Sequence, residues 1–252
     1  MPHADYNLPF FRNMHNVSVR SAEVVVPLLV EALQPRSVLD VGCGTGAWLN
    51  EFRRCGVDDI RGIEGDWAPA EFLQFPPDLI RRTDAGSGFD LGRRFDLAVT
   101  VEVAEHIEPS KARQFVSDLT KHADVAYFTA AIPGQGGTSH LNEQWPDFWA
   151  SVFGEHCFRL VDWPRQALWD DARVDPCVIQ NGFLYIRDGV SEPAGLPRRE
   201  PWPLRMVHPR LFEHTLAKMS DPETLKACLT AKRALMMLPA LLRRSVAERL
   251  SS

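Results

Sequence analysis

The stretch VLDVGCGTG, residues 38–46, is an apolar run with one acidic residue, Asp40, followed by glycines at alternate positions. Such a run is typical of a buried strand, and glycines allow the next loop to turn tightly and bring its main chain close to a ligand. We therefore expect a buried strand that leads into a ligand-binding loop. This combination favours an α/β protein, in which strands and helices alternate along the chain.

The glycines have the spacing G-x-G-x-G, at Gly42, Gly44 and Gly46. The dinucleotide-binding pattern G-x-G-x-x-G is met only loosely, because the last glycine comes one residue early. A phosphate-binding P-loop would need the sequence G-K-[ST], which does not follow these glycines. The spacing argues against a P-loop and, by itself, leaves the nucleotide cofactor open.

Strand patterns alternate with helical patterns beyond this loop as well. The strand before Gly42 is followed by predicted strands over 59–64, 95–101, 124–131, 158–163 and 182–187. Helices are predicted over 21–33, 47–55, 109–121 and 143–153, and residues 1–20 have a less regular pattern. This alternation predicts a doubly wound, mostly parallel sheet.

The composition is that of an ordinary globular protein, with 45% hydrophobic and 24% charged residues in a chain of 252. The net charge of -5 gives no general attraction to nucleic acid. Five cysteines without a C-x-x-C pair indicate neither a zinc knuckle nor a disulfide framework, and no apolar leader or membrane segment is evident. We expect a cytoplasmic protein with no nucleic-acid or membrane partner.

The C-terminal part differs from the rest of the chain. A Gly- and Pro-rich stretch, 189–197, marks a boundary, and Asp221-Pro222 is a typical helix start. Residues 226–252 contain six basic side chains and one acidic one. A basic amphipathic tail suits a membrane surface or an anionic partner, but docking on an acidic body or across a homodimer is the simpler expectation. We predict an N-terminal helical cover (1–35), a core (36–188) and a linker with a helical C-terminal extension (189–252).

The run EVAEHI, Glu102 to Ile107, follows the predicted strand 95–101. Together with VLDVGCGTG it resembles the motifs of class I S-adenosylmethionine (SAM)-dependent methyltransferases of the small-molecule type, similar to bacterial sugar and secondary-metabolite methyltransferases. The resemblance covers roughly residues 36–188. It implies a Rossmann-like, seven-stranded, mostly parallel sheet with helices on both faces, SAM as cofactor and S-adenosylhomocysteine (SAH) as product.

Cofactor contacts are expected where the strands end, since ligands of open α/β sheets lie beyond the carboxyl ends of the strands. Glu64 ends the second strand and can accept hydrogen bonds from both ribose hydroxyls, although a nicotinamide cofactor would use the same carboxylate. The resemblance implies that Asp40 fixes the glycine loop, and that Asp84 meets the adenine amino group unless it only caps its own turn. The predicted cofactor-binding residues are Asp40, Gly42, Cys43, Gly44, Gly46, Glu64, Gly65, Asp66, Trp67, Asp84, Ala85 and Glu102.

Methyl transfer from a sulfonium is an in-line displacement, so the protein mainly has to align the acceptor. A hydroxyl acceptor also gains from a base, and histidine is the simplest candidate. His106 follows a strand, and His140 lies in the polar, glycine-containing loop 131–145. We predict His140, His106 and Glu143 as catalytic residues, although His140 could instead bond the backbone at a helix entry.

The predicted activity is methyl transfer to a small-molecule acceptor, on a hydroxyl oxygen of a sugar or secondary metabolite. Three alternatives stay open: N-methylation of an amine, a non-catalytic SAM-binding partner subunit and an NAD-dependent oxidoreductase. Acidic and histidine side chains could also gather a divalent ion that binds a diol acceptor. Nothing in their spacing requires this, so no metal is predicted; the residues concerned are Glu102, Glu105, His106, His140 and Glu143.

Overall fold

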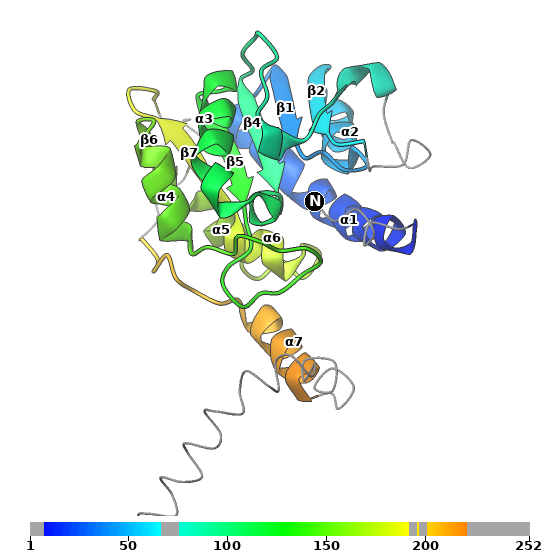
Figure 1. The fold of residues 1–252 in the computed structure, drawn as a ribbon, viewed down its shortest axis with the longest axis vertical. Coiled ribbons are helices and arrows are strands. Elements are labelled where there is room, and N and C mark those ends of the chain that lie inside the picture. The colour runs from blue at the N-terminus through cyan, green and yellow to red at the C-terminus, as the bar shows by residue number, and fades with distance from the viewer. Residues whose placement is uncertain (1–7, 67–75, 192–195, 197–200, 221–252) are drawn as a thin grey trace, which may run out of the picture. The chain divides into compact units, whose positions relative to one another are not determined.

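The computed structural model describes residues 8–66, 76–191, 196 and 201–220 (Figure 1). Its centre is one seven-stranded sheet in the order β3-β2-β1-β4-β5-β7-β6. All neighbouring strands are parallel except β7, which is antiparallel to both β5 and β6. The strands are β1 (Ser37–Val41), β2 (Asp59–Glu64), β3 (Ile80–Arg82), β4 (Leu97–Val101), β5 (Val125–Thr129), β6 (Phe158–Val161) and β7 (Phe183–Arg187).

Helices connect the strands and cover the sheet. The α-helices are α1 (Leu8–Leu33), α2 (Ala47–Arg54), α3 (Ala112–His122), α4 (Pro146–Gly154), α5 (Trp163–Leu168), α6 (Pro176–Asn181) and α7 (Pro209–Ser220). Short 3-10 turns follow some strands: η3 (Pro77–Leu79), η4 (Ala85–Ser87), η5 (Ala104–His106) and η6 (Pro109–Lys111). From β1 the chain adds strands first toward one edge of the sheet (β2, β3) and then, from β4 on, toward the other edge. Doubly wound sheets bind their ligands at such a switch point, here between β1 and β4.

Each face of the sheet has its own hydrophobic core, because side chains along a strand point alternately to opposite faces. On β1, Val38 packs with α1, α2, α5 and α6, whereas Leu39 packs with α3 and α4. Both side chains are fully buried. Burial on both faces explains why the strand sequences are nearly continuous apolar runs. The prediction of a doubly wound, mostly parallel sheet with helices on both faces is confirmed (Figure 1).

The N-terminal helix is longer than predicted. It begins at Leu8 instead of residue 21 and contains Pro27. Four of its residues are buried in the core that it shares with α2: Ala22, Val25, Val26 and Leu29. Strand β3 and helices α5 and α6 were not predicted, because each has only three to six residues and shows too little periodicity.

Residues 201–208, which follow the Gly- and Pro-rich stretch, lie against the core. Arg165 is fully buried and donates to the backbone oxygens of Pro203 and Leu204. The backbone nitrogen of His208 donates to the Gln180 side chain. The chain divides into two compact units between His208 and Pro209, so the first unit extends beyond residue 188.

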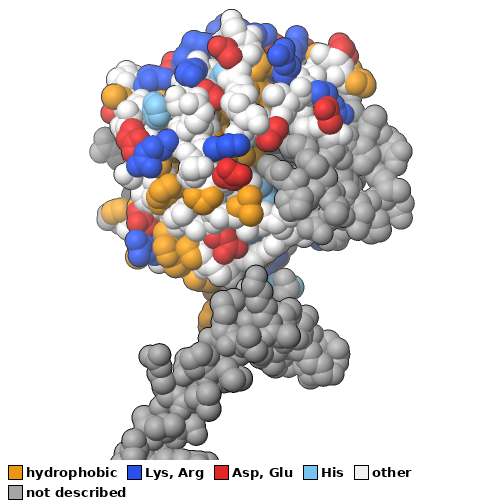
Figure 2. Space-filling view, viewed as in Figure 1, with side chains coloured by type: hydrophobic (Ala, Val, Ile, Leu, Met, Phe, Trp, Pro, Cys, Tyr) orange, Lys and Arg blue, Asp and Glu red, His pale blue; other side chains and the backbone are white. Residues whose placement is uncertain are grey.

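Helix α7 belongs to the second unit, whereas the predicted helix start at Asp221 and the basic residues 226–252 lie outside the described residues. None of the described helices is both long and apolar enough to span a membrane. On the face seen in Figure 2, basic and acidic side chains are interspersed.

Candidate active site

The glycine loop folds back over the end of β2. The backbone nitrogens of Gly42 and Cys43 both donate to the carbonyl oxygen of Ile63, at 2.8 and 3.0 Å. Gly42 has φ +78°, and a Cβ there would lie 2.4 Å from a methyl carbon of Val103. A side chain at position 42 is therefore excluded by both backbone conformation and space. Gly46 ends the loop as the N-cap of α2.

Glu64 holds this loop from the end of β2. Its carboxylate accepts hydrogen bonds from the backbone nitrogens of Gly44, at 2.6 Å, and Gly65, at 2.9 Å. We expected Asp40 to fix the loop, but no hydrogen bond reaches its side chain among the described residues. The loop crosses the end of β2, which brings Gly44 beside Glu64. Each carboxylate oxygen has two lone pairs, so Glu64 can still accept bonds from a ribose.

Asp40 is buried directly beneath the loop, with 3% of its surface exposed. Burial, and then the negative charge of Glu64, raise the pKa of Asp40 to about 8. A positive charge placed beside Asp40 would stabilise its ionised carboxylate and so oppose this rise in pKa. A ligand with a cationic group is therefore well matched to the loop.

Helix α1 completes this part of the site. His15 and Ser18 line a cavity of about 60 Å³ together with Asp40 and the glycine loop. The His15 Nδ1 atom lies 3.1 Å from the Thr45 hydroxyl oxygen. Neither residue was predicted from the sequence, where the only available signal was two polar side chains three positions apart on one helix, which by itself points to no ligand.

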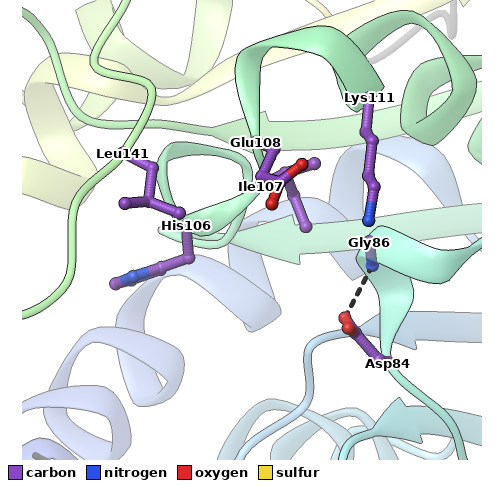
Figure 3. Close-up of a pocket in the computed structure, with 7 residues that line it drawn as sticks. All are labelled: Asp84, Gly86, His106, Ile107, Glu108, Lys111 and Leu141. Carbon is purple, nitrogen blue, oxygen red and sulfur yellow. Dashed lines mark hydrogen bonds between the residues drawn. The ribbon is translucent and has the colours of Figure 1, made fainter. Parts of the chain in front are cut away.

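A second, larger hollow of about 280 Å³ lies beyond the ends of the strands (Figure 3). Asp84 and Lys111 reach toward one another across it, with Gly86 between them. The Asp84 carboxylate accepts a hydrogen bond from the backbone nitrogen of Gly86, at 2.9 Å, and so caps its own turn. Its neighbour Ala85 is buried. The wall of the hollow also includes His106, Ile107, Glu108 and Leu141.

Two predicted cofactor residues lie at the edge of the described structure. Asp66 is exposed, and Trp67 lies outside the described residues. Gly65 accepts a hydrogen bond at its backbone oxygen from Arg82, at 2.8 Å.

Glu102 follows β4 with φ +53°, an uncommon conformation for a residue other than glycine. Its carboxylate accepts bonds from the side-chain amides of Gln135, at 2.8 Å, and Asn181, at 3.0 Å. Burial raises the pKa of Glu102, while these bonds oppose the rise. The network joins the strand ends to the loop 131–145, and neither amide residue was predicted.

The three predicted catalytic residues do come together. The rings of His106 and His140 meet edge to face, with centroids 4.9 Å apart. The Nδ1 atom of His140 lies 2.9 Å from a carboxylate oxygen of Glu143. That carboxylate also accepts bonds from the backbone nitrogens of Gly134 and Gly136, at 2.7 and 2.8 Å. Glu143 therefore positions both His140 and the loop.

The strand-end motif contributes a fourth group, Glu105, which has no solvent exposure. Its carboxylate oxygen Oε1 lies 4.0 Å from the Nε2 atom of His140. Burial, and after it the neighbouring His140, lower the pKa of His106 to about 4, so the His106 imidazole is neutral near pH 7. A neutral imidazole beside a buried carboxylate can bind a hydroxyl group or a cation.

A protein-family model shows which family the chain belongs to. The family model described as a methyltransferase domain matches residues 14–162, more than half of the chain. The chain belongs to this methyltransferase family. It is a SAM-dependent enzyme, as the glycine loop and the Glu102–Ile107 motif indicated, and the alternatives of an oxidoreductase and a non-catalytic subunit fall away.

Solved structures share the fold of this methyltransferase. The sugar N-methyltransferase KedS8 from Streptoalloteichus has a TM-score of 0.55 and 17% identity, over 71% of this chain and 91% of KedS8. Streptomyces venezuelae DesVI has a TM-score of 0.54 and 15% identity, over 74% of this chain and 99% of DesVI. At such identities the likeness shows the fold alone. No curated protein sequence matches the methyltransferase.

The methyltransferase should be stabilised by Asp40→Asn when no ligand is bound. In the fold Asp40 keeps its proton up to about pH 8, whereas its ordinary pKa is 3.8. Between about pH 4 and pH 8 the native state therefore binds more protons than the unfolded state, so its free energy of unfolding falls as pH rises. Above about pH 8 we expect the variant to unfold with a free energy about 1–3 kcal/mol higher than the native enzyme. Near pH 4 the two should agree. Urea unfolding at both pH values checks this, and equal stability throughout would contradict it.

Proposed function

We propose that this methyltransferase transfers the methyl group of SAM to a hydroxyl oxygen of a small molecule, such as a sugar or another secondary metabolite. The observation that carries the proposal is the arrangement of His140, with one ring nitrogen on Glu143 and the other toward Glu105. A hydroxyl is a weak nucleophile, and this side-chain cluster can help it lose its proton. An amine acceptor would have less need of such a cluster.

For the cofactor, we propose that the glycine loop and Asp40 hold the amino-acid part of SAM, and that Glu64 binds the ribose. The larger hollow beside Asp84 would take the adenine. The support is the order of these groups along the strand ends: β1 carries Asp40, β2 carries Glu64, and Asp84 follows β3. His106 lines the adenine-side hollow and also touches His140, so the catalytic cluster borders the cofactor.

The second candidate is N-methylation of a sugar amine. The fold shared with the sugar N-methyltransferase KedS8 favours it. The two candidates are separated by supplying SAM with a ¹³C-labelled methyl group and a panel of sugar nucleotides, each with either free hydroxyls or an amino group. NMR of the product should show a methoxy carbon. An N-methyl carbon, with none of the hydroxyl sugars methylated, would overturn the proposal in favour of the second candidate.

Gly137→Ala tests the position of His140. A Cβ at residue 137 would lie 2.2 Å from the His140 Nε2 atom, so the imidazole has to move. Because a small misplacement of a reacting group is costly, we expect turnover to fall by about 10- to 100-fold with SAM affinity unchanged. Gly154→Ala is the matched control, since nothing lies within 4 Å of its added Cβ. Native turnover in Gly137→Ala would contradict this placement.

The small-molecule acceptor, the cytoplasmic location and a homodimer through the C-terminal helices remain predictions. So do the domain bounds 1–35, 36–188 and 189–252.

A further inference from the structure

The geometry points to a divalent-cation site formed by Glu105, His106 and His140, which we propose binds Mn²⁺ or a similar cation. Each residue offers a ligand atom, and these atoms all lie within 4.8 Å of one another. One carboxylate oxygen and two imidazole nitrogens form a donor set that suits first-row divalent metals. The two histidines come from separate segments, the turn after β4 and the loop 131–145, so the site depends on the fold.

The Glu105 carboxylate is the strongest sign of a missing partner. It is completely buried, and among the described residues neither oxygen accepts a well-aligned hydrogen bond; its polar interactions there are with the backbone of Glu105 and Ala131 and with the Glu102 carboxyl group. Leaving a buried carboxylate unsatisfied is costly unless it is paired, and coordination of a metal is one of the ways to pair it. Glu102 provides the contrast, because its two oxygens are bonded by Asn181 and Gln135.

The hydrogen bonds of the two histidines favour the same conclusion. The Nδ1 atom of His140 lies 2.9 Å from the Glu143 carboxylate, and that of His106 lies 3.4 Å from the backbone oxygen of Ser139. Both partners only accept hydrogen bonds, so each Nδ1 carries the proton and the lone pair of each ring is on Nε2. Metal-binding histidines are usually oriented in this way, by a carboxylate or a carbonyl on the other nitrogen.

The backbone holds the two segments in register. The nitrogens of Leu141 and Asn142 donate to the backbone oxygen of Glu105, at 2.8 and 2.9 Å. These bonds fix the loop that carries His140 against the turn that carries Glu105 and His106. The three ligands are therefore arranged before any cation arrives, which lowers the cost of binding.

A cation here would deepen the proposed function, on which this part of the inference rests. Three protein ligands leave positions for two oxygens of the acceptor, so the site favours a substrate with adjacent oxygens, such as a vicinal diol. Its hydroxyl loses a proton to solvent water more readily when the oxygen is bound to the cation. That oxygen then forms the new C–O bond as the C–S bond of SAM breaks, giving a methyl ether, SAH and one proton.

The test is titration of the ligand-free full chain with Mn²⁺, followed by calorimetry and by electron paramagnetic resonance. We expect one bound ion per chain. Glu105→Gln and His140→Ala should each weaken binding by about 100-fold or more. His156→Ala, a histidine remote in sequence from the cluster, should bind as the native protein does. Mn²⁺ should also raise the Tm of the native protein but not that of Glu105→Gln.

Folding of Glu105→Gln is checked by its circular dichroism spectrum and by its affinity for SAH, which should match the native values. Absence of Mn²⁺ binding by the native chain, or equal binding by a folded Glu105→Gln variant, would overturn the site. The binding measurements need neither SAM nor acceptor. Failure of the site is therefore separate from failure of the proposed function, which the ¹³C-methyl assay tests. Methylation of a diol that persists undiminished in excess chelator would overturn the catalytic role of the ion.

Discussion

Glu64→Gln is expected to weaken the binding of SAM and SAH by about 100-fold, the effect of losing charge-assisted hydrogen bonds to two ribose hydroxyls. The same carboxylate accepts bonds from the nitrogens of Gly44 and Gly65. A glutamine would present an NH₂ group to one of these donors, so the glycine loop would shift as well. Calorimetric titration with SAH measures the effect without any acceptor.

The matched control for this variant is Glu51→Gln. Glu51 is also a largely buried glutamate close to the loop, on α2, but it pairs with Arg54 and not with the loop. Its replacement should leave SAH affinity within about twofold of the native value, a difference well under 1 kcal/mol. If Glu64→Gln binds SAH as tightly as Glu51→Gln does, the ribose does not contact Glu64.

His140→Ala is expected to lower turnover by about 10²- to 10⁴-fold, the range for removing a group that assists proton transfer. SAM affinity should stay the same, because His140 does not line the cavity at the glycine loop. Turnover is measured on the acceptor identified with ¹³C-methyl SAM, and SAM binding is measured by calorimetry on the same preparation.

His156→Ala is the control for this second variant and should keep native turnover. A large loss of SAM affinity in His140→Ala would show that the residue acts on the cofactor. Native turnover would show that His140 takes no part in the reaction. Either result contradicts the proposed function of the cluster.

The glycine loop and Glu64 could be predicted from the sequence because their positions follow from topology. Parallel strands end at one edge of the sheet, so the residues at or just beyond the ends of β1 and β2 must meet there. What the sequence could not predict is which carboxylate holds the loop. The choice of Glu64 over Asp40 depends on the hydrogen bonds from Gly42 and Cys43 to Ile63, which bring the loop across the end of β2.

Contacts that form only when one helix packs on another could not be predicted in the same way. His15 and Ser18 reach the site only because α1 packs on α2, and the pattern of α1 alone does not show where its polar face points. The cluster at His140 was predicted in part. Its residues were identified, but the complete burial of Glu105 without a well-aligned hydrogen bond arises only when the loop 131–145 closes on the turn after β4.

The most direct test of this account is a crystal structure of the enzyme with SAH bound. The ribose hydroxyls should lie within hydrogen-bond distance of the Glu64 carboxylate, and the sulfur should face the side of the cofactor on which Glu105, His106 and His140 lie. An SAH molecule whose sulfur points away from these three side chains, or whose ribose is bound elsewhere, would contradict the account.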